Sequence, residues 1–186
     1  MGRRLSRLAS ARGIESREAK WILYRQAFPP RQGERVLDVG VSRLDDLPGE
    51  NYFLRQYPHP SQVTAVGVHD LTGLAERYPE IEFVQADGRE LPFQDGAFDV
   101  VHSNAVIEHV GPRGEQARFV SELVRVAKNG FVTTPNRWFP VEPHTHVPLF
   151  HWLPRRLALL LLRREWIVWL LSRRTFRRLF PAGVDV

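Results

Sequence analysis

The sequence contains no cysteine. Disulfide scaffolds, thiolate catalysis and zinc or iron–sulfur sites with cysteine ligands are therefore excluded. The sequence also lacks the Gly-x-x-x-x-Gly-Lys phosphate loop and the Gly-x-Gly-x-x-Gly turn of dinucleotide-dependent dehydrogenases, which excludes both kinds of phosphate site. The N-terminus has no apolar core of the kind that a secretory signal needs, so we expect a cytoplasmic protein.

Long apolar runs are absent as well. The apolar blocks at 157–162 and 166–171 are separated by arginine pairs, and neither reaches the roughly 18 residues of a membrane-spanning helix. Arginines also crowd residues 3–17, and the net charge is +5 with a pI near 10.2. Clustered arginines can mark an anionic partner or simply a solvated helix face. We expect arginine-rich apolar helices in residues 154–186 that pack on the rest of the protein or also rest on anionic lipid, as a peripheral membrane contact.

The overall composition is that of one folded domain. The 186 residues are 43% hydrophobic and 25% charged, which is ordinary for a globular protein. Residues 15–28 have helical spacing and end at Pro29-Pro30, so residues 1–30 are expected to form a basic amphipathic helix. The core domain would then comprise residues 31–153.

Within this core, short apolar runs alternate with stretches of helical spacing. The runs that predict strands are 35–40, 63–68, 81–86, 98–102 and 130–134, and the helical stretches are 50–57, 71–78 and 114–128. Such alternation predicts an α/β fold with a doubly wound, mostly parallel sheet. Ligands of such a sheet bind beyond the carboxyl ends of its strands.

Acidic and glycine residues follow three of these strands at their carboxyl ends. They are Asp38 with Gly40, then Asp70, then Asp87 with Gly88. A glycine in the first turn lets the backbone approach a ligand, and an acid after the second strand can accept both hydroxyls of a ribose. A single aspartate in such a place more often caps a helix, but three at one edge together predict the recognition of a nucleoside.

Four segments carry a family resemblance: Val36–Gly40, Val66–Asp70, Gln85–Phe93 and Phe98–Val110. On the basis of these segments, residues 33–153 resemble the class I S-adenosylmethionine-dependent methyltransferases, in particular the small-molecule group that includes quinone-biosynthesis enzymes. The resemblance implies a Rossmann-like fold, S-adenosylmethionine as cofactor and methyl transfer as activity. It implies the following cofactor contacts: Gly40 at the methionine moiety, Asp70 at the ribose, Asp87 and Gly88 at the adenine, and Ser103 and Asn104 beside the cofactor after the fourth strand. Asp38, in the same turn as Gly40, is a further candidate cofactor contact.

The sequence departs from this family in its glycine-rich turn. Asp-x-Gly-x-Gly-x-Gly becomes Asp38-Val-Gly-Val-Ser-Arg-Leu44, so a side chain at Ser42 or Leu44 could narrow the cofactor cleft. His69 occupies the position that usually holds the ribose-binding acid, which comes one residue later as Asp70. A degenerate, non-catalytic binding module is therefore an alternative.

The family also adds an antiparallel hairpin after the fifth strand. Here the chain stops at residues 183–186, where the first strand of that hairpin could be starting. We expect either a truncated chain or a sheet that is short on this edge. An open edge invites pairing, so a homodimer is a further expectation.

His109 is the candidate general base, because an imidazole titrates near neutral pH and this one follows the fourth strand. Packing or capping is the alternative role. Glu108 and His109, with His144 and His146, could suggest a hard-ligand metal site, but Ala105 stands where metal-dependent relatives carry a further glutamate. We therefore assign no metal.

The acceptor is expected to contact the loop after the fifth strand. Residues 134–152 are dense in proline, aromatic residues and histidine, and loops beyond strand ends commonly form binding sites. The candidate acceptor-binding residues are Asn136, Trp138, Phe139, His144 and Trp152. Core packing of these aromatics is the alternative.

Together these features predict methyl transfer to a small or lipid-like acceptor, at oxygen or carbon. An RNA 2′-O-methyltransferase is another alternative, which the basic charge favours and Ala105 disfavours. Base N-methylation is disfavoured because Ser103-Asn-Ala-Val follows the fourth strand in place of Pro-Pro-aromatic. Nucleic acid is thus not the expected partner.

Overall fold

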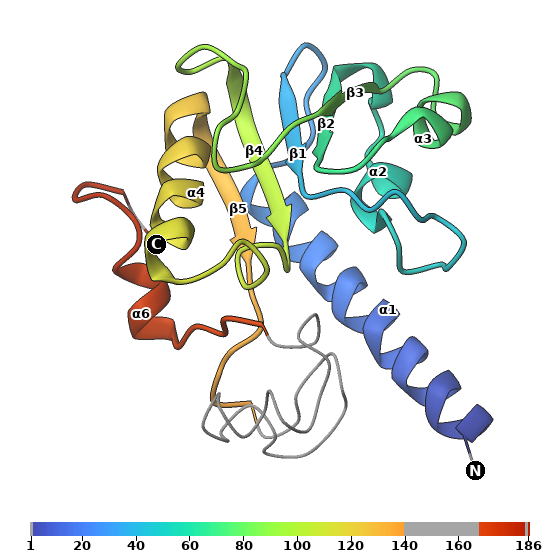
Figure 1. Cartoon of the computed structure of the whole chain (residues 1–186). Coiled ribbons are helices and arrows are strands. Elements are labelled where there is room, and N and C mark those ends of the chain that lie inside the picture. The colour runs from blue at the N-terminus through green and yellow to red at the C-terminus, as the bar shows by residue number, and fades with distance from the viewer. Residues whose placement is uncertain (1, 140–167, 185) are drawn as a thin grey trace.

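The computed structural model describes residues 2–139, 168–184 and 186. Five strands form one all-parallel sheet in the order β3-β2-β1-β4-β5 (Figure 1). Their bounds are β1 Val36–Val39, β2 Val63–Gly67, β3 Glu82–Gln85, β4 Phe98–Asn104 and β5 Ala127–Thr133. The doubly wound α/β fold predicted from the sequence is therefore confirmed.

Helices cover both faces of this sheet. Their bounds are α1 Gly2–Ala27, α2 Tyr52–Gln56, α3 Thr72–Arg77, α4 Arg113–Val126 and α6 Arg173–Arg177, with a short 3-10 helix at Pro60–Gln62. The helix α1 runs from Gly2 to Ala27, within the range 1–30 that was expected to form a helix, and it ends before Pro29-Pro30. None of the helices in the described part of the chain is long and apolar enough to cross a membrane.

The two faces of the sheet bury separate hydrophobic clusters. Leu37 and Val39 of β1 pack with Phe119 of α4 on one face, while Val36 packs with Tyr24 of α1 on the other. This division follows from the strand, because successive side chains point to opposite faces. Each face is thus held by aromatic or branched side chains that are almost completely buried.

The helix α4 passes into β5 without a loop. Ala127 already has extended backbone angles and lies opposite Phe98 in the β4–β5 register. The strand therefore begins at Ala127 and not at residue 130, because Ala127, the last apolar residue of the predicted helical stretch, already pairs with Phe98 of β4.

Beyond β5 the chain lies beside the segment that leads into α6. Asn136 and Leu171 form a parallel bridge, and the backbone N–H of Arg137 donates to the carbonyl of Leu171 (2.9 Å). Residues 183, 184 and 186 form no strand, and β3 and β5 are the two edges of the described sheet. The homodimer stays a prediction, and the helices expected between residues 155 and 167 lie outside the described residues.

Candidate functional site

A cavity of about 170 Å³ opens beside the carboxyl ends of β1 and β4. The strand order reverses between these two strands, which makes this point the usual ligand-binding position of an open parallel sheet. Its lining comes from α1, from β1 and the turn after it, from residues 49–53, and from β4. The charged and polar side chains at the cavity include Arg17, Lys20, Asp38, Ser42, Asn51, His102 and Asn104.

The turn after β1 depends on Gly40. This residue has a φ of +100°, and the N–H groups of Gly40 and Val41 both donate to the carbonyl of Val66 (2.8 and 3.0 Å). A Cβ at Gly40 would overlap the side chain of Val106, which follows β4. Glycine is therefore required here by the backbone angle and also by the close packing.

An asparagine organises the part of the loop where the family pattern has its other glycines. Asn51 has a φ of 44°, and its side chain accepts from the N–H of Ser42 (3.0 Å) and donates to the carbonyls of Ser42 (3.0 Å) and Leu44 (3.2 Å). Ser42 lines the cavity, whereas Leu44 is 51% exposed and does not. Of the two side chains that could narrow the cleft, only the smaller one therefore reaches it.

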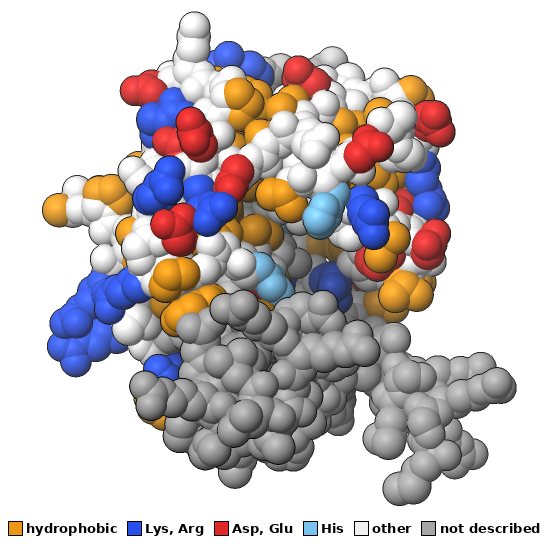
Figure 2. All heavy atoms as spheres, viewed as in Figure 1, with side chains coloured by type: hydrophobic (Ala, Val, Ile, Leu, Met, Phe, Trp, Pro, Cys, Tyr) orange, Lys and Arg blue, Asp and Glu red, His pale blue; other side chains and the backbone are white. Residues whose placement is uncertain are grey.

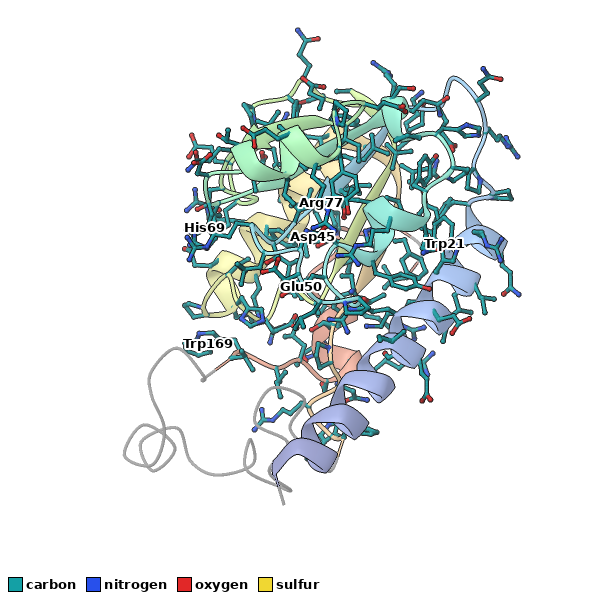
Figure 3. The ribbon with its side chains drawn as sticks, turned by 90° about the vertical axis from the view of Figure 1, so that its right-hand side faces the viewer. Trp21, Asp45, Glu50, His69, Arg77 and Trp169 are labelled. Atoms are coloured by element: carbon teal, nitrogen blue, oxygen red, sulfur yellow. The ribbon has the colours of Figure 1, made fainter. Side chains whose placement is uncertain are left out.

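Asp45 fixes this loop to the rest of the protein. Its carboxylate is 3% exposed and forms ion pairs with Arg55 (2.7 Å) and Arg77 (3.2 Å). The hydroxyl of Tyr78 donates to its second oxygen (2.6 Å). Figure 3 shows Asp45 and Arg77 beside each other. With Asn51, whose side chain also donates to Oδ1 (3.3 Å), four partners thus compensate a carboxylate that would otherwise be costly to bury.

A buried acid–histidine pair lies at the wall of the cavity. Asp38 and His102 are opposite each other in the β1–β4 register, and Asp38 Oδ1 lies 2.7 Å from His102 Nδ1. The imidazole stacks on the ring of Phe53, with 4.0 Å between centroids, and parallel to Phe131 at 6.0 Å. A carboxylate at Nδ1 favours the tautomer in which this nitrogen carries the proton, so that Nε2 can accept one.

The helix α1 brings two cations to the same cavity. Lys20 Nζ donates to Asn104 Oδ1 (2.8 Å), and Thr133 Oγ1 donates to the same oxygen (2.7 Å). Burial lowers the pKa of Lys20, the nearby Arg17 lowers it further, and Glu108 opposes the shift. Sequence reasoning missed Arg17, Lys20 and His102, because none of them belongs to a strand-end turn.

The three residues expected at the adenosine lie outside this lining. Asp70 is exposed, and its Oδ1 accepts from the N–H (3.0 Å) and the hydroxyl (2.6 Å) of Thr72, which lower its pKa. Asp87 accepts from Arg89 at both oxygens, and these hydrogen bonds hold its pKa below the usual value. A Cβ at Gly88 would come within 2.6 Å of the ring of Phe119, so this glycine permits α4 to pack.

The remaining candidates lie after β4 and β5. The buried hydroxyl of Ser103 donates to the carbonyl of Val39 (3.0 Å), inside the sheet. His109 is exposed in the turn after β4 and does not line the cavity. Asn136 accepts from the N–H of Trp138 (3.0 Å), and Trp138 and Phe139 are 63% and 61% exposed.

Two of the acceptor-binding candidates, His144 and Trp152, lie outside the described residues, as does His146 of the metal alternative. Among the residues that are described, no three or more acidic or histidine side chains are grouped as metal ligands.

Comparison with known proteins connects this geometry to one family. Residues 50–132 match the family described as "Methyltransferase domain". A Mycobacterium tuberculosis protein described as a "Probable S-adenosylmethionine-dependent methyltransferase" is 45% identical over 122 residues, which is 62% of this chain and 41% of that protein. The demethylmenaquinone methyltransferase of Beutenbergia cavernae is 30% identical over 126 residues, which is 62% of this chain and 48% of that enzyme.

The chain thus spans less than half the length of these curated relatives. Among solved structures, the YcgJ protein of Bacillus subtilis has a TM-score of 0.61 at 18% identity, over 87% of this chain and 66% of that one. Phosphoethanolamine N-methyltransferase 2 of Haemonchus contortus, solved with S-adenosyl-L-methionine, has a TM-score of 0.60 at 15% identity, over 87% of this chain and 35% of that one. At these identities the two structures indicate a common fold.

Proposed function

The chain belongs to the class I S-adenosylmethionine-dependent methyltransferases, and on that premise we propose that it transfers a methyl group from S-adenosylmethionine to a small or lipid-like acceptor. The observation that carries this proposal is the cavity between β1 and β4, where the Gly40 turn meets cationic side chains of α1. This is the point of the sheet at which the amino-acid end of the cofactor would enter.

The residues around the cavity fit that end of the cofactor. Its carboxylate would lie near Arg17 and Lys20, because charge-assisted hydrogen bonds from cations are the strong partners of a carboxylate. Its α-amino group would lie near the acidic residues of the cavity lining, Asp38 and Glu50. The absence of a side chain at Gly40 lets the backbone approach the ligand closely.

The adenosine end would extend along the carboxyl ends of β2 and β3. Asp70 Oδ1 is occupied by Thr72, but Oδ2 has no hydrogen-bond partner within the described residues and would accept from the ribose hydroxyls. Asp87 and Gly88 would lie at the adenine, with Arg89 holding the Asp87 carboxylate in place.

The chemistry that the cofactor supplies is a methyl group on a sulfonium, which an acceptor atom displaces in line. The protein then chiefly aligns the acceptor and excludes water. A base is needed when the acceptor is a hydroxyl or an acidic carbon. His109 was the candidate from the sequence, but His102 fits this role better, because it lines the cavity and Asp38 orients its ring.

The acceptor class rests on the relatives and on the loop after β5. A demethylmenaquinone methyltransferase and phthiotriol/phenolphthiotriol dimycocerosates methyltransferases are among the similar proteins, and all of these names denote apolar, lipid-like acceptors. Trp138 and Phe139 are exposed where such a molecule would approach. O- or C-methylation of a lipid-like acceptor is therefore our proposal for this chain.

Calorimetric titration with S-adenosylhomocysteine is the first test. We expect saturable binding to the purified chain, and a loss of affinity of about tenfold or more in Asp70→Asn, because one or two charge-assisted hydrogen bonds disappear. The matched control is Asp95→Asn, which removes another exposed carboxylate, in the turn before β4, that does not line the cavity.

Activity is then measured with methyl-labelled S-adenosylmethionine and a lipid extract, with label in the organic phase as the readout. Transfer of label to lipid supports the proposal. No cofactor binding by a chain with a cooperative unfolding transition would reject it and favour the degenerate binding module.

A further inference from the structure

The short helix α6 has two different faces. Phe176 and Phe180 pack against the hydrophobic cluster below α4, and Leu179 is 9% exposed within that cluster. The opposite face carries the exposed arginines Arg173, Arg174, Arg177 and Arg178. The other three follow Arg173 by one, four and five residues, and this spacing places all four arginines on one side of the helix.

These four arginines have no acidic partner in the described part of the chain. By contrast, Arg89 forms an ion pair with Asp87, and Arg125 forms one with Glu122. Within residues 168–184 there is no acidic residue. Figure 2 shows the resulting group of basic side chains at the lower left of the molecule, over α6. The surface therefore keeps its positive charge available for an external anion.

Exposed aromatic residues lie next to this basic face. The bridge between Asn136 and Leu171 fixes the chain after β5 beside the residue that precedes Ser172, the N-cap of α6. Two residues further along, Trp138 and Phe139 are exposed, and the guanidinium group of Arg137 lies 5.8 Å from the centre of the Trp138 ring. The basic face at residues 173–178 and the aromatic pair at residues 137–139 thus lie on two segments that the Asn136–Leu171 bridge holds together.

We propose that residues 137–139 and 173–178 form a docking surface for an anionic phospholipid membrane. Arginine binds phosphate groups through its planar fork, and tryptophan favours the interface between headgroups and acyl chains. A nucleic acid would match the charge alone, whereas the exposed Trp138 and Phe139 favour a surface that is charged outside and apolar beneath.

The position of this surface relates it to the cavity. The N–H of Trp169 donates to the carbonyl of Glu108 (2.8 Å), and Gln116 Nε2 donates to the carbonyl of Trp169 (2.8 Å), so the segment leading into α6 is fixed to the turn after β4. Asn104, at the end of that strand, lines the cavity. Docking would therefore bring the membrane to the carboxyl-end side of the sheet. The proposal does not depend on methyl transfer, because it predicts membrane binding by the chain without cofactor or acceptor.

Vesicle sedimentation with the full chain tests the proposal. The probes are vesicles of phosphatidylcholine alone and vesicles that also contain phosphatidylglycerol, at low and at physiological salt. We expect binding only to the anionic vesicles and weaker binding at higher salt. Each arginine near a membrane surface contributes about 1 kcal/mol, or about fivefold in affinity. The double variant Arg174→Gln/Arg178→Gln should therefore bind about 25-fold more weakly.

The matched control removes the same charge from the other end of the strands. Arg31 and Arg35 are exposed residues just before β1, and Arg31→Gln/Arg35→Gln should retain the binding of the unmodified chain. Equal losses in the two double variants would overturn the proposal in favour of general electrostatic attraction. Equal binding to neutral and anionic vesicles would overturn it too, as would a loss of single-stranded RNA binding in the α6 variant with vesicle binding unchanged. Cooperative urea unfolding of each variant shows that the fold is retained.

Discussion

Substitution of Gly40 by alanine separates two physical reasons for a glycine in the turn after β1. The φ of +100° disfavours any residue with a Cβ, at a cost of about 1–3 kcal/mol. The added methyl group also overlaps Val106, and overpacking of this kind typically costs about 1–3 kcal/mol. We therefore expect Gly40→Ala to reduce the free energy of unfolding by about 2–6 kcal/mol.

A double-mutant cycle with Val106→Ala distinguishes the two contributions. The shorter side chain at position 106 removes the overlap but leaves the backbone angle unchanged. The double variant should therefore be more stable than the sum of the single effects predicts, by about 1–3 kcal/mol. Urea unfolding followed by circular dichroism gives all four free energies.

Two results would refute this reasoning. If the free energy of unfolding of Gly40→Ala is within about 0.5 kcal/mol of that of the unmodified chain, the turn does not need a glycine. If the cycle is additive within about 0.5 kcal/mol, Val106 does not limit the space above Gly40. The unmodified chain and Val106→Ala alone serve as references for each comparison.

Two further predictions concern buried or partly buried carboxylates. Asp45→Asn should lower the free energy of unfolding in urea by about 2–3 kcal/mol. This is less than the about 3–5 kcal/mol lost when a fully buried ion pair is broken, because the side chain of Arg77 is 52% exposed. An unchanged urea midpoint would contradict the role assigned to Asp45. The pKa of Glu122 is held below its usual value of 4.5 by hydrogen bonds from Arg125, so its contribution to stability is present above pH 4.5 and is lost as the pH falls through the lowered pKa. Glu122→Gln should therefore lower stability at neutral pH and flatten the loss on acidification, and an unchanged pH profile would show that the pair contributes nothing.

The strands could be predicted from the sequence because they are short apolar runs with turn residues at their ends. The pairing and register of the strands could not be predicted in this way. Asp38 and His102, for example, meet only because β1 lies beside β4. In the sequence His102 is one polar residue within a buried strand, and nothing local marks it as part of a pair. Which strands are neighbours is a tertiary property that the local pattern does not contain.

Some of the residues that line the cavity could be predicted from the sequence, and others could not. Asp38 and Gly40 were predicted from their places at a strand end and Asn104 from the family resemblance, and all three line the cavity. Arg17 and Lys20 could not be predicted, because their contribution depends on where a long helix docks. The helix itself was predicted, but its basic residues fitted a solvated face equally well.

The way in which α1 docks explains how one helix serves both the core and the site. Trp21 and Tyr24 pack on Phe53, with ring centroids 5.9 and 5.0 Å away, and Figure 3 shows Trp21 where α1 meets the body of the protein. Arg17 and Lys20 precede these rings by about one helical turn, so the same face that is anchored by the aromatic residues carries the cations to the cavity. A ligand that binds these cations therefore also stabilises the docked position of α1, by an amount set by its concentration relative to its dissociation constant. Cofactor affinity in this chain should accordingly depend on the aromatic packing below α1 as well as on the groups that touch the ligand.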